Sequence, residues 1–477
     1  MRKSIAVTSN PSSANTLDCA AAKCKNLKSI TVLLLLIAVI VVFGSGVWEA
    51  KVLAESNAGA AFGVWPDTGQ DKCYSYSDTE IPCPSEGEPF YGQDAQYQGP
   101  KRSYTKLGYG GIELPDSATP AEGWIMTRDN VTGLIWEIKT DDGTIHDKNN
   151  RYVRKGIEQN FIASLNSDQF GGYSDWRLPT IKELSTLLDS SISAPGPKID
   201  TNYFPNTMQG IYWSSTGLKC LTTELCVSWT VYFDYGLVTS PTYGSDHYVR
   251  AVRGGSQPLS LNSFIDNNDG TITDTKTGLM WQKCSMGQTY NPSTNGCEGS
   301  EMKYKWQQAL EVCEKFNFAG YDDWRLPNRN ELQSIVDYSK IDTTNDRAAI
   351  DTNYFPVSDQ HFNYISSTTV LQSPSEAWYL DLGPGLIKRG GKNAWWHVRA
   401  VRLGASRVEL GDVSGDGQLN IVDALFVARY AVGLPVSNFN ANAADVNCDN
   451  QINIVDALLI ARKIVGLPVN GWCASSI

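Results

Sequence analysis

The sequence lacks most of the motifs that carry enzyme chemistry. It contains four histidines, at positions 146, 247, 361 and 397, and none belongs to an H-E-x-x-H metal-binding motif. It has no G-x-S-x-G nucleophile motif and no glycine-rich phosphate loop. The absence of any C-x-x-C pair argues against zinc-knuckle and thioredoxin-like domains. We therefore expect a protein that is not an enzyme.

Positive charge is also scarce. The chain carries 40 Lys and Arg against 51 Asp and Glu, a net charge of −11. Nucleic acids and other polyanions bind to positive faces, so we expect no nucleic-acid partner. Hydrophobic residues make up 42% of the 477 residues, with 14 Trp and 22 Tyr. This content predicts packed cores, and the length allows about three domains.

One long apolar run, residues 30–47, stands near the start of the sequence. It is preceded by five basic residues that favour a cytoplasmic N-terminus: Arg2, Lys3, Lys23, Lys25 and Lys28. Its 18 residues are intermediate between a membrane-spanning helix and a signal-peptide core. Val52-Leu53-Ala54 is an acceptable cleavage site, whereas the long leader is typical of an uncleaved anchor, and both alternatives stay open. We assign residues 1–54 to this leader and helix, and expect the rest to be exported, either membrane-anchored at the cell envelope or secreted.

The cysteines agree with export. Nine of the 11 follow the apolar run, an odd number in an oxidising compartment. Nearness in sequence suggests the disulfides Cys73–Cys83, Cys220–Cys226 and Cys284–Cys297. Cys313 aligns with Leu165 on an apolar helix face, so we predict that it is the free thiol, which leaves Cys448 to pair with Cys473. The alternative is that Cys313 pairs with Cys284 or Cys297, and that the last two cysteines stay free or cross-link chains.

Two similar acidic loops stand 33 residues apart, DVSGDGQLNIVD at 412–423 and DVNCDNQINIVD at 445–456. Side-chain oxygens at positions 1, 3, 5, 9 and 12, with a carbonyl at 7, match the spacing that wraps a calcium ion. The predicted ligands are Asp412, Ser414, Asp416, Gln418, Asn420 and Asp423, and then Asp445, Asn447, Asp449, Gln451, Asn453 and Asp456. Three carboxylates in each loop repel one another without a cation, so two calcium ions are expected. The alternative is a pair of polar turns that bind nothing.

Each loop is followed by an apolar helical segment, IVDALFVARYAVGLP or IVDALLIARKIVGLP, and Gly433 and Gly466 are predicted to end the two helices. No helix is expected before either loop. This loop-then-helix duplication resembles a type I dockerin, the module that binds cohesin domains. The resemblance implies a cohesin-like partner and a docking surface at Ile421, Val422, Ile454 and Val455. Dockerins often have small polar residues at these positions, so these apolar pairs have the alternative of packing against other domains of the chain.

The middle of the chain is a duplication. Four segments recur about 150 residues further along, far too long a period for a solenoid. They are TGLIWE and TGLMWQ, YSDWRLPTIKEL and YDDWRLPNRNEL, IDTNYFP in both, and YVRAVRGG and HVRAVRLG. In each unit we predict a helix before WRLP, a second helix after it that is capped by Thr180 with Glu183 or by Asn328 with Glu331, and short β-rich segments thereafter.

These motifs resemble the domain at the C-terminus of the Legionella collagen-like adhesin. The resemblance covers roughly residues 63–404 and implies a fold similar to C-type lectins and to the formylglycine-generating enzyme, with adhesion or glycan binding as its function. The lead-in at 67–97 is typical of the opening of such proteins, and we assign it to the first domain. We expect the motif arginines to be structural, each paired with an acid such as Asp175 or Asp323.

The two units differ at 385–399, GLIKRGGKNAWWHVR, where the first unit has GLVTSPTYGSDHYVR. Aromatic faces beside cations suit carbohydrate rings that carry acidic groups. The predicted ligand-binding residues are Lys388, Arg389, Lys392, Trp395 and Trp396. The alternative is a basic hairpin tip with one Trp in the core.

The expected fold class is α+β: two tandem C-type-lectin-like domains at 60–255 and 256–404, and a small all-α calcium-binding dockerin at 405–470. The expected function is an exported cell-envelope protein that binds a glycan or surface ligand and docks a cohesin-type partner. One alternative is an interaction subunit of a polysaccharide-degrading assembly. The other, an enzyme of the formylglycine-generating kind, needs a redox-active cysteine pair or copper site, and no such pair recurs in both units.

Overall fold

The structure is a computed structural model. It describes residues 65–97, 99–217, 228–239, 245–254, 264–340, 348–357, 363–404, 410–414, 419–434, 436, 439–447, 449, 451–469 and 471–472. The expected signal or anchor helix lies outside these residues. Within them, no helix combines the length and the apolarity that crossing a membrane requires.

The first part of the chain comprises a lead-in, residues 65–97, and repeat 1, residues 99–254. The lead-in contains β1 (Cys73–Tyr74), β2 (Glu80–Ile81) and the 3-10 turn η1 (Asp94–Gln96). The strands of repeat 1 are β3 (Tyr104–Leu107), β4 (Met126–Asp129), β5 (Ile135–Glu137), β6 (Tyr152–Val153), β7 (Ile211–Gly217), β8 (Ser228–Tyr232), β9 (Leu237–Thr239), β10 (Asp246–His247) and β11 (Val252–Arg253). Its helices are the π-helix η5 (Ile157–Ile162), α2 (Ala163–Ser167) and α3 (Ile181–Thr186), with 3-10 turns η2 (Tyr109–Gly111), η3 (Pro120–Glu122), η4 (Arg154–Gly156) and η6 (Phe170–Gly172).

Repeat 2, residues 264–404, follows a similar order of elements, with the hairpin β15–β16 as an addition. Its strands are β12 (Phe264–Asp266), β13 (Thr271–Asp274), β14 (Leu279–Gln282), β15 (Thr289–Asn291), β16 (Gly296–Glu298), β17 (Lys303–Tyr304), β18 (Asn363–Thr369), β19 (Glu376–Asp381), β20 (Leu386–Gly391), β21 (Trp396–His397) and β22 (Val401–Leu403). Its helices are α4 (Trp306–Glu314) and α5 (Arg329–Ser334), with the turn η7 (Tyr338–Lys340). The mixture of helices and antiparallel strands confirms the α+β class.

Each repeat has a four-stranded antiparallel sheet of its own, in the order β11-β5-β4-β3 and β12-β13-β14-β22. The helix after WRLP begins as predicted, with a reciprocal cap. The Glu183 N–H donates to the Thr180 hydroxyl at 3.2 Å, and the Thr180 N–H donates to the Glu183 carboxylate at 2.8 Å. Asn328 and Glu331 make the same pair of bonds in repeat 2. The capping pairs are therefore confirmed in both repeats.

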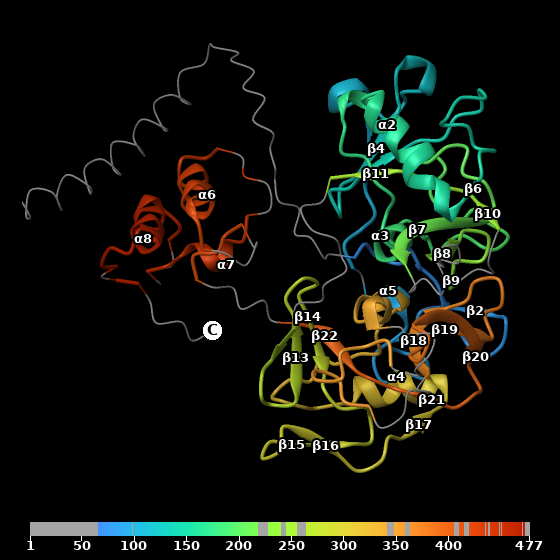
Figure 1. Ribbon diagram of the computed structural model, residues 1–477. Coiled ribbons are helices and arrows are strands. Elements are labelled where there is room, and N and C mark those ends of the chain that lie inside the picture. Colours follow the sequence, from blue (N-terminus) through green and yellow to red (C-terminus); the bar gives the residue numbers. More distant parts are fainter. Residues whose placement is uncertain are drawn as a thin grey trace, which may run out of the picture. The chain divides into compact units, whose positions relative to one another are not determined.

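A second sheet joins the repeats. Its eight strands run β17-β21-β18-β19-β20-β9-β8-β7, and at the join Val238 of β9 pairs with Ile387 of β20 (Figure 1). These residues occupy equivalent positions, GLV in repeat 1 and GLI in repeat 2, so equivalent strands meet antiparallel as in a two-fold symmetric dimer. One apolar core extends across the join and includes Trp229 and Trp378. The two repeats thus share a core.

Helices α3 and α5 also meet at this junction, which we call the seam. The Gln333 side-chain amide donates to the Ser185 hydroxyl at 2.9 Å, and these two positions are again equivalent. The Lys182 ammonium donates to the Ser334 carbonyl at 2.6 Å. The Trp229 ring of repeat 1 packs edge-on against Tyr338 of repeat 2.

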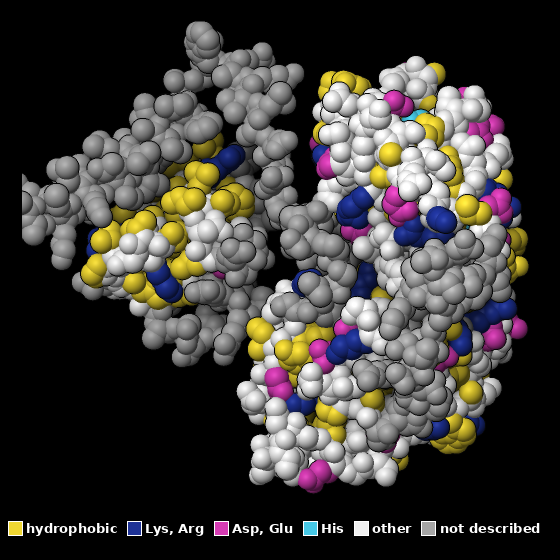
Figure 2. Space-filling view, in the orientation of Figure 1, with side chains coloured by type: hydrophobic (Ala, Val, Ile, Leu, Met, Phe, Trp, Pro, Cys, Tyr) yellow, Lys and Arg dark blue, Asp and Glu magenta, His cyan; other side chains and the backbone are white. Residues whose placement is uncertain are grey.

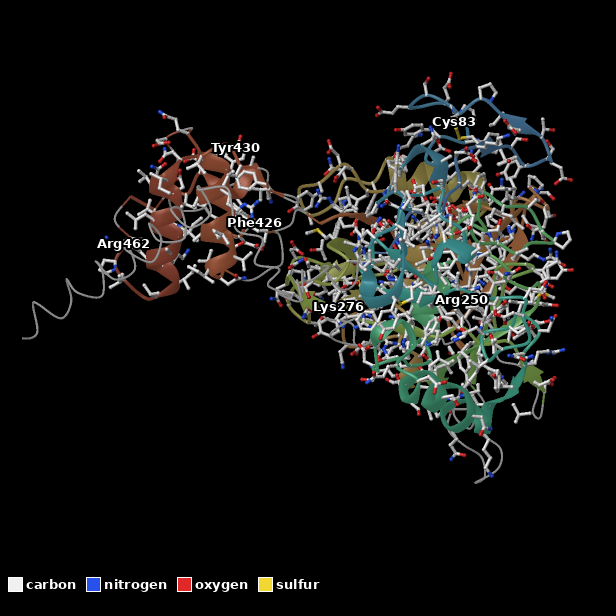
Figure 3. The ribbon with its side chains drawn as sticks, turned by 90° about the horizontal axis from the view of Figure 1, so that it is seen from above. Cys83, Arg250, Lys276, Phe426, Tyr430 and Arg462 are labelled. Atoms are coloured by element: carbon white, nitrogen blue, oxygen red, sulfur yellow. A yellow bond between two sulfur atoms is a disulfide. The ribbon has the colours of Figure 1, made fainter. Side chains whose placement is uncertain are left out.

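The lead-in, which we assign to the first domain, packs mainly on repeat 2. The Gln70 side chain exchanges two hydrogen bonds with the Thr369 backbone, and Phe90 packs beside Trp306. In Figure 1 the blue lead-in accordingly lies next to the orange strands β19 and β20. Its disulfide, Cys73–Cys83, is marked by Cys83 in Figure 3.

The C-terminal module, residues 410–472, is built on α6 (Ile421–Ala431) and α8 (Ile454–Ile464), which pack against each other. Both helices end as predicted, with Gly433 and Gly466 in the left-handed conformation at φ 74° and 71°. A third helix, the four-residue α7 (Ala441–Ala444), ends directly before the second loop. The expectation that no helix precedes either loop is therefore wrong for the second one, because ANAA is too short to show helical periodicity.

The described cysteines follow the predicted pattern. The structure contains the disulfides Cys73–Cys83 and Cys284–Cys297. Cys313 is free and buried on α4, as predicted, and burial raises the pKa of its thiol. The other two predicted bridges, Cys220–Cys226 and Cys448–Cys473, lie outside the described residues.

Candidate calcium loops, docking surface and basic hairpin

The second acidic loop gathers its side-chain oxygens around its own backbone. Both Asp445 and Asn447 accept a hydrogen bond from the Asp449 N–H, at 3.2 and 3.1 Å, so positions 1 and 3 point their oxygens to one place. At position 12, Asp456 is fully buried and accepts the N–H groups of Val446 and Asn453. Burial raises the pKa of Asp456, and the nearby Asp445 charge adds to this. A cation bound in the loop would favour the charged form of Asp456 and so oppose both effects on its pKa.

The first loop is similar where it is described. Asp423 at position 12 is fully buried and accepts the N–H groups of Ser414 and Asn420, at 2.9 and 2.8 Å. Asp412 is buried too and accepts a bond from the Ser414 hydroxyl. The predicted ligands Asp416 and Gln418 lie outside the described residues.

The ligand set suits a hard cation but is not purely acidic. In the described part of the chain, no three His, Cys, Asp or Glu side chains form a metal-binding group. The asparagines at position 9 turn a side-chain oxygen to the following helix, since Asn420 caps the Val422 N–H and Asn453 caps the Val455 N–H. In calcium loops position 9 often acts through a water molecule, which is compatible with this capping role. The oxygen donors that remain, carboxylates, amides and carbonyls, are the ligands calcium prefers.

An apolar surface lies at the start of both helices. The predicted docking residues Ile421, Val422, Ile454 and Val455 are between 41% and 58% exposed, whereas Ala424, Val427, Ala457 and Ile460 are buried. Further along α6, Tyr430 is exposed and stacks on Phe439. Figure 2 shows hydrophobic side chains gathered on the visible face of the C-terminal module, and Figure 3 labels Phe426 and Tyr430 on α6 and Arg462 on α8. An exposed apolar patch of this kind is typical of a protein-binding surface.

The basic hairpin of repeat 2 does not form one open cluster. Lys388 and Arg389 pair with acids on the neighbouring strand, Lys388 with Asp381 at 2.7 Å and Arg389 with Glu376 at 3.8 Å. Trp396 is buried, while Trp395 is 58% exposed with the Lys305 ammonium 5.8 Å from its ring centre.

Lys392 points inward, and its prediction as a ligand cation is wrong. It is fully buried, its ammonium lies 3.7 Å from the ring centre of Trp306, and it donates to the Ser75 carbonyl. Burial lowers the pKa of Lys392 to about 7. The hairpin therefore corresponds to the alternative of a basic tip with one Trp in the core, and Trp395 is its exposed aromatic residue.

The motif arginines are structural. Arg177 and Arg325 each form a two-point ion pair with a helix-capping glutamate, Glu183 or Glu331. Two more pair with the acids expected from sequence, Arg253 with Asp175 and Arg402 with Asp323. Arg250 and Arg399 are buried and donate to backbone carbonyls, and Figure 3 shows Arg250 inside repeat 1.

One polar cluster was missed from the sequence. In repeat 1 the buried Glu137 accepts from Lys139 at 2.9 Å and contacts His146 at 2.8 Å. Burial alone would raise the pKa of Glu137, but Lys139 and His146 outweigh it and lower the pKa. Repeat 2 has Gln282 and the disulfide cysteine Cys284 at the positions of Glu137 and Lys139. Comparison of WEIK with WQKC shows this exchange of an ion cluster for a disulfide.

Comparison with known protein families matches residues 125–253 and 270–402 to the Lcl C-terminal domain, and residues 410–465 to the dockerin type I domain. No curated protein matches the chain. Both kinds of domain are interaction modules and fit an extracellular protein. The dockerin match supports calcium binding and implies a cohesin partner.

Proposed function

We propose, on the premise that the chain belongs to the Lcl C-terminal domain family and carries a dockerin type I domain, that it is an exported adhesin-like protein. Its dockerin holds two calcium ions and docks a cohesin-type domain, while its repeats bind a glycan at the cell surface. The observation that carries the docking half is the repeated arrangement of an oxygen-lined loop, a capped helix and an exposed Ile-Val pair. The two disulfides among the described residues, one in the lead-in and one in repeat 2, support an oxidising compartment.

The docking half is tested with the full chain and a panel of cohesin-type domains in calcium. The double variant Val422→Asp with Val455→Asp places a charge on each exposed pair and should weaken binding at least about tenfold, since a buried unpaired charge is costly. Ile265→Asp, at a residue of repeat 2 that is 53% exposed, is the matched control and should bind normally. Normal binding by the double variant would reject this surface.

The glycan half rests on Trp395, an exposed aromatic face with a cation beside it. Trp395→Ala should abolish binding on a glycan array, whereas replacing the ion-paired Lys388 should weaken it only slightly. Thermal unfolding of both variants shows whether the fold is retained. If the wild-type chain binds no glycan on the array, or if the Trp395→Ala variant binds normally, the hairpin is not a glycan-binding site.

A further inference from the structure

The two repeats differ in one contact that their shared sequence does not predict. In repeat 2 the lead-in covers the end of β18, so Ser367, Thr368 and Thr369 are all at most 1% exposed. In repeat 1 the equivalent end of β7 is open: Ser215 and Thr216 are half-buried and Gly217 is exposed. We call the strand end together with its neighbouring arginine the cradle of each repeat.

The cradle of repeat 2 shows what such a surface binds. The Asp94 carboxylate of the lead-in accepts the Thr368 hydroxyl at 2.6 Å. Three residues later, the ring of Tyr97 lies 5.2 Å from the Arg325 guanidinium. Upstream, the side-chain amide of Gln70 exchanges two hydrogen bonds with the Thr369 backbone. The occupant is therefore a polypeptide segment with a carboxylate followed by an aromatic ring.

The cradle of repeat 1 has the same internal construction. The Ile181 N–H donates to the Thr216 hydroxyl at 2.9 Å, as the Arg329 N–H does to Thr368. The backbone N–H groups of Ser215 and Ser367 donate to the backbone carbonyls of Pro179 and Pro327, which are equivalent residues. Within the described residues, however, Thr216 donates to no carboxylate. The Arg177 side chain is 33% exposed, against 9% for Arg325.

The segment that two-fold symmetry would bring to the cradle of repeat 1 does not match the lead-in. The lead-in precedes repeat 1 and crosses to repeat 2, so two-fold symmetry would require the segment that precedes repeat 2 to cross back. That segment is the nine-residue linker 255–263, which connects the end of β11 to the start of β12. It contains no Asp, Glu or aromatic residue. The lead-in, in contrast, provides 33 residues, 65–97.

We infer that the cradle of repeat 1, formed by Ser215, Thr216, Gly217 and Arg177, is a docking site for a polypeptide segment of a partner protein. The segment brings a carboxylate to the Thr216 hydroxyl and, three residues later, an aromatic ring to the Arg177 guanidinium. It repeats between two proteins the contact that Asp94 and Tyr97 make within this chain.

The probe is a fluorescent peptide with the sequence of residues 88–99, EPFYGQDAQYQG, titrated into the full chain. We expect saturable binding of one peptide per chain. A peptide with Asn in place of Asp94 should bind at least about tenfold more weakly, because it loses a hydrogen bond to a charged group.

Two variants locate the site. Thr216→Val should weaken the peptide at least about tenfold, whereas its counterpart Thr368→Val in repeat 2 should leave binding no weaker. Gly217→Glu is the second test if Thr216→Val fails to fold: a Cβ there meets nothing within 4 Å, and the added carboxylate repels an acidic peptide. Absence of saturable binding, or loss of binding in Thr368→Val but not in Thr216→Val, would overturn the inference. Self-association of the wild-type chain that the peptide reverses would identify a second copy as the occupant and also overturn it.

Discussion

Asp94 links the lead-in to repeat 2, and its surroundings strongly alter its pKa. It is buried and accepts hydrogen bonds from Thr68 and Thr368, but burial outweighs these bonds and raises the pKa of Asp94 to about 7. Between the ordinary value of 3.8 and about 7, the folded chain keeps a proton that the unfolded chain has released. The free energy of unfolding contributed by Asp94 therefore falls as the pH rises through this window.

We predict that Asp94→Asn removes this pH dependence. In denaturant unfolding, the free energy of unfolding of the wild type should rise from pH 8 to pH 5. This rise should exceed that of the variant by at least about 1 kcal/mol. An equal pH response of the two proteins would mean that Asp94 has an ordinary pKa in the folded state.

Lys392 shows the opposite effect. Its pKa is lowered to about 7 by burial, so below the ordinary value of 10.5 the folded state resists a proton that the unfolded state takes up. The group therefore costs stability as the pH falls toward 7. We predict that Lys392→Met, which keeps the packing on Trp306, raises the midpoint of thermal unfolding at pH 7, measured by calorimetry. Lys388→Met, at a partly exposed ion pair, should change it little. A large drop for Lys392→Met would show that the ammonium is needed.

At the scale of elements, the C-terminal module depends on its two loops. Each loop buries a position-12 carboxylate that also caps the following helix, so the loop and the helix form together. Metal binding to such a site contributes directly to folding.

We predict that Asp412→Ala and Asp445→Ala each remove one of two calcium sites in titration calorimetry, and that each lowers the helical circular dichroism signal without calcium restoring it fully. Asp71→Ala, in the lead-in, is the acidic control and should retain both sites. Fewer than two sites in the wild type would contradict the proposal.

The elements that were predicted correctly depend on local sequence. The capping pairs and the helices after the loops are set by residues a few positions apart, and the two disulfides join cysteines 10 and 13 positions apart. The free Cys313 followed from its alignment with Leu165 on an apolar helix face. The contacts that were missed join distant residues: Gln70 bonds Thr369, 299 positions away, and Lys392 is buried by Ser75 of the lead-in. A lysine in a Gly-Gly hairpin is expected to be exposed, and only the covering lead-in makes it buried.

At the scale of the whole molecule, the seam makes the repeats one cooperative unit. The β9–β20 pair, the α3–α5 contact and the crossing lead-in all connect repeat 1 to repeat 2. We predict that cleavage at a protease site placed within linker 255–263 leaves the two halves associated in gel filtration. Denaturant should separate them, because the shared core and not the linker holds them together.

The lead-in and repeat 1 expressed together without repeat 2, as residues 60–255, should aggregate, since this fragment would expose Val238 and the β9 edge. Expression of 60–404 is the matched control and should give soluble protein. Halves that separate after cleavage, or a soluble and stable fragment 60–255, would contradict a shared core.

The pairing of equivalent strands has a consequence for dilution. Two separate chains that met through such an interface would dissociate at low concentration, since their association is bimolecular. Here nine residues connect the partners, so the local concentration of each repeat around the other is fixed by the linker and reaches the millimolar range, about what short linkers give. The paired form is therefore insensitive to dilution, which would suit the exported protein that we propose.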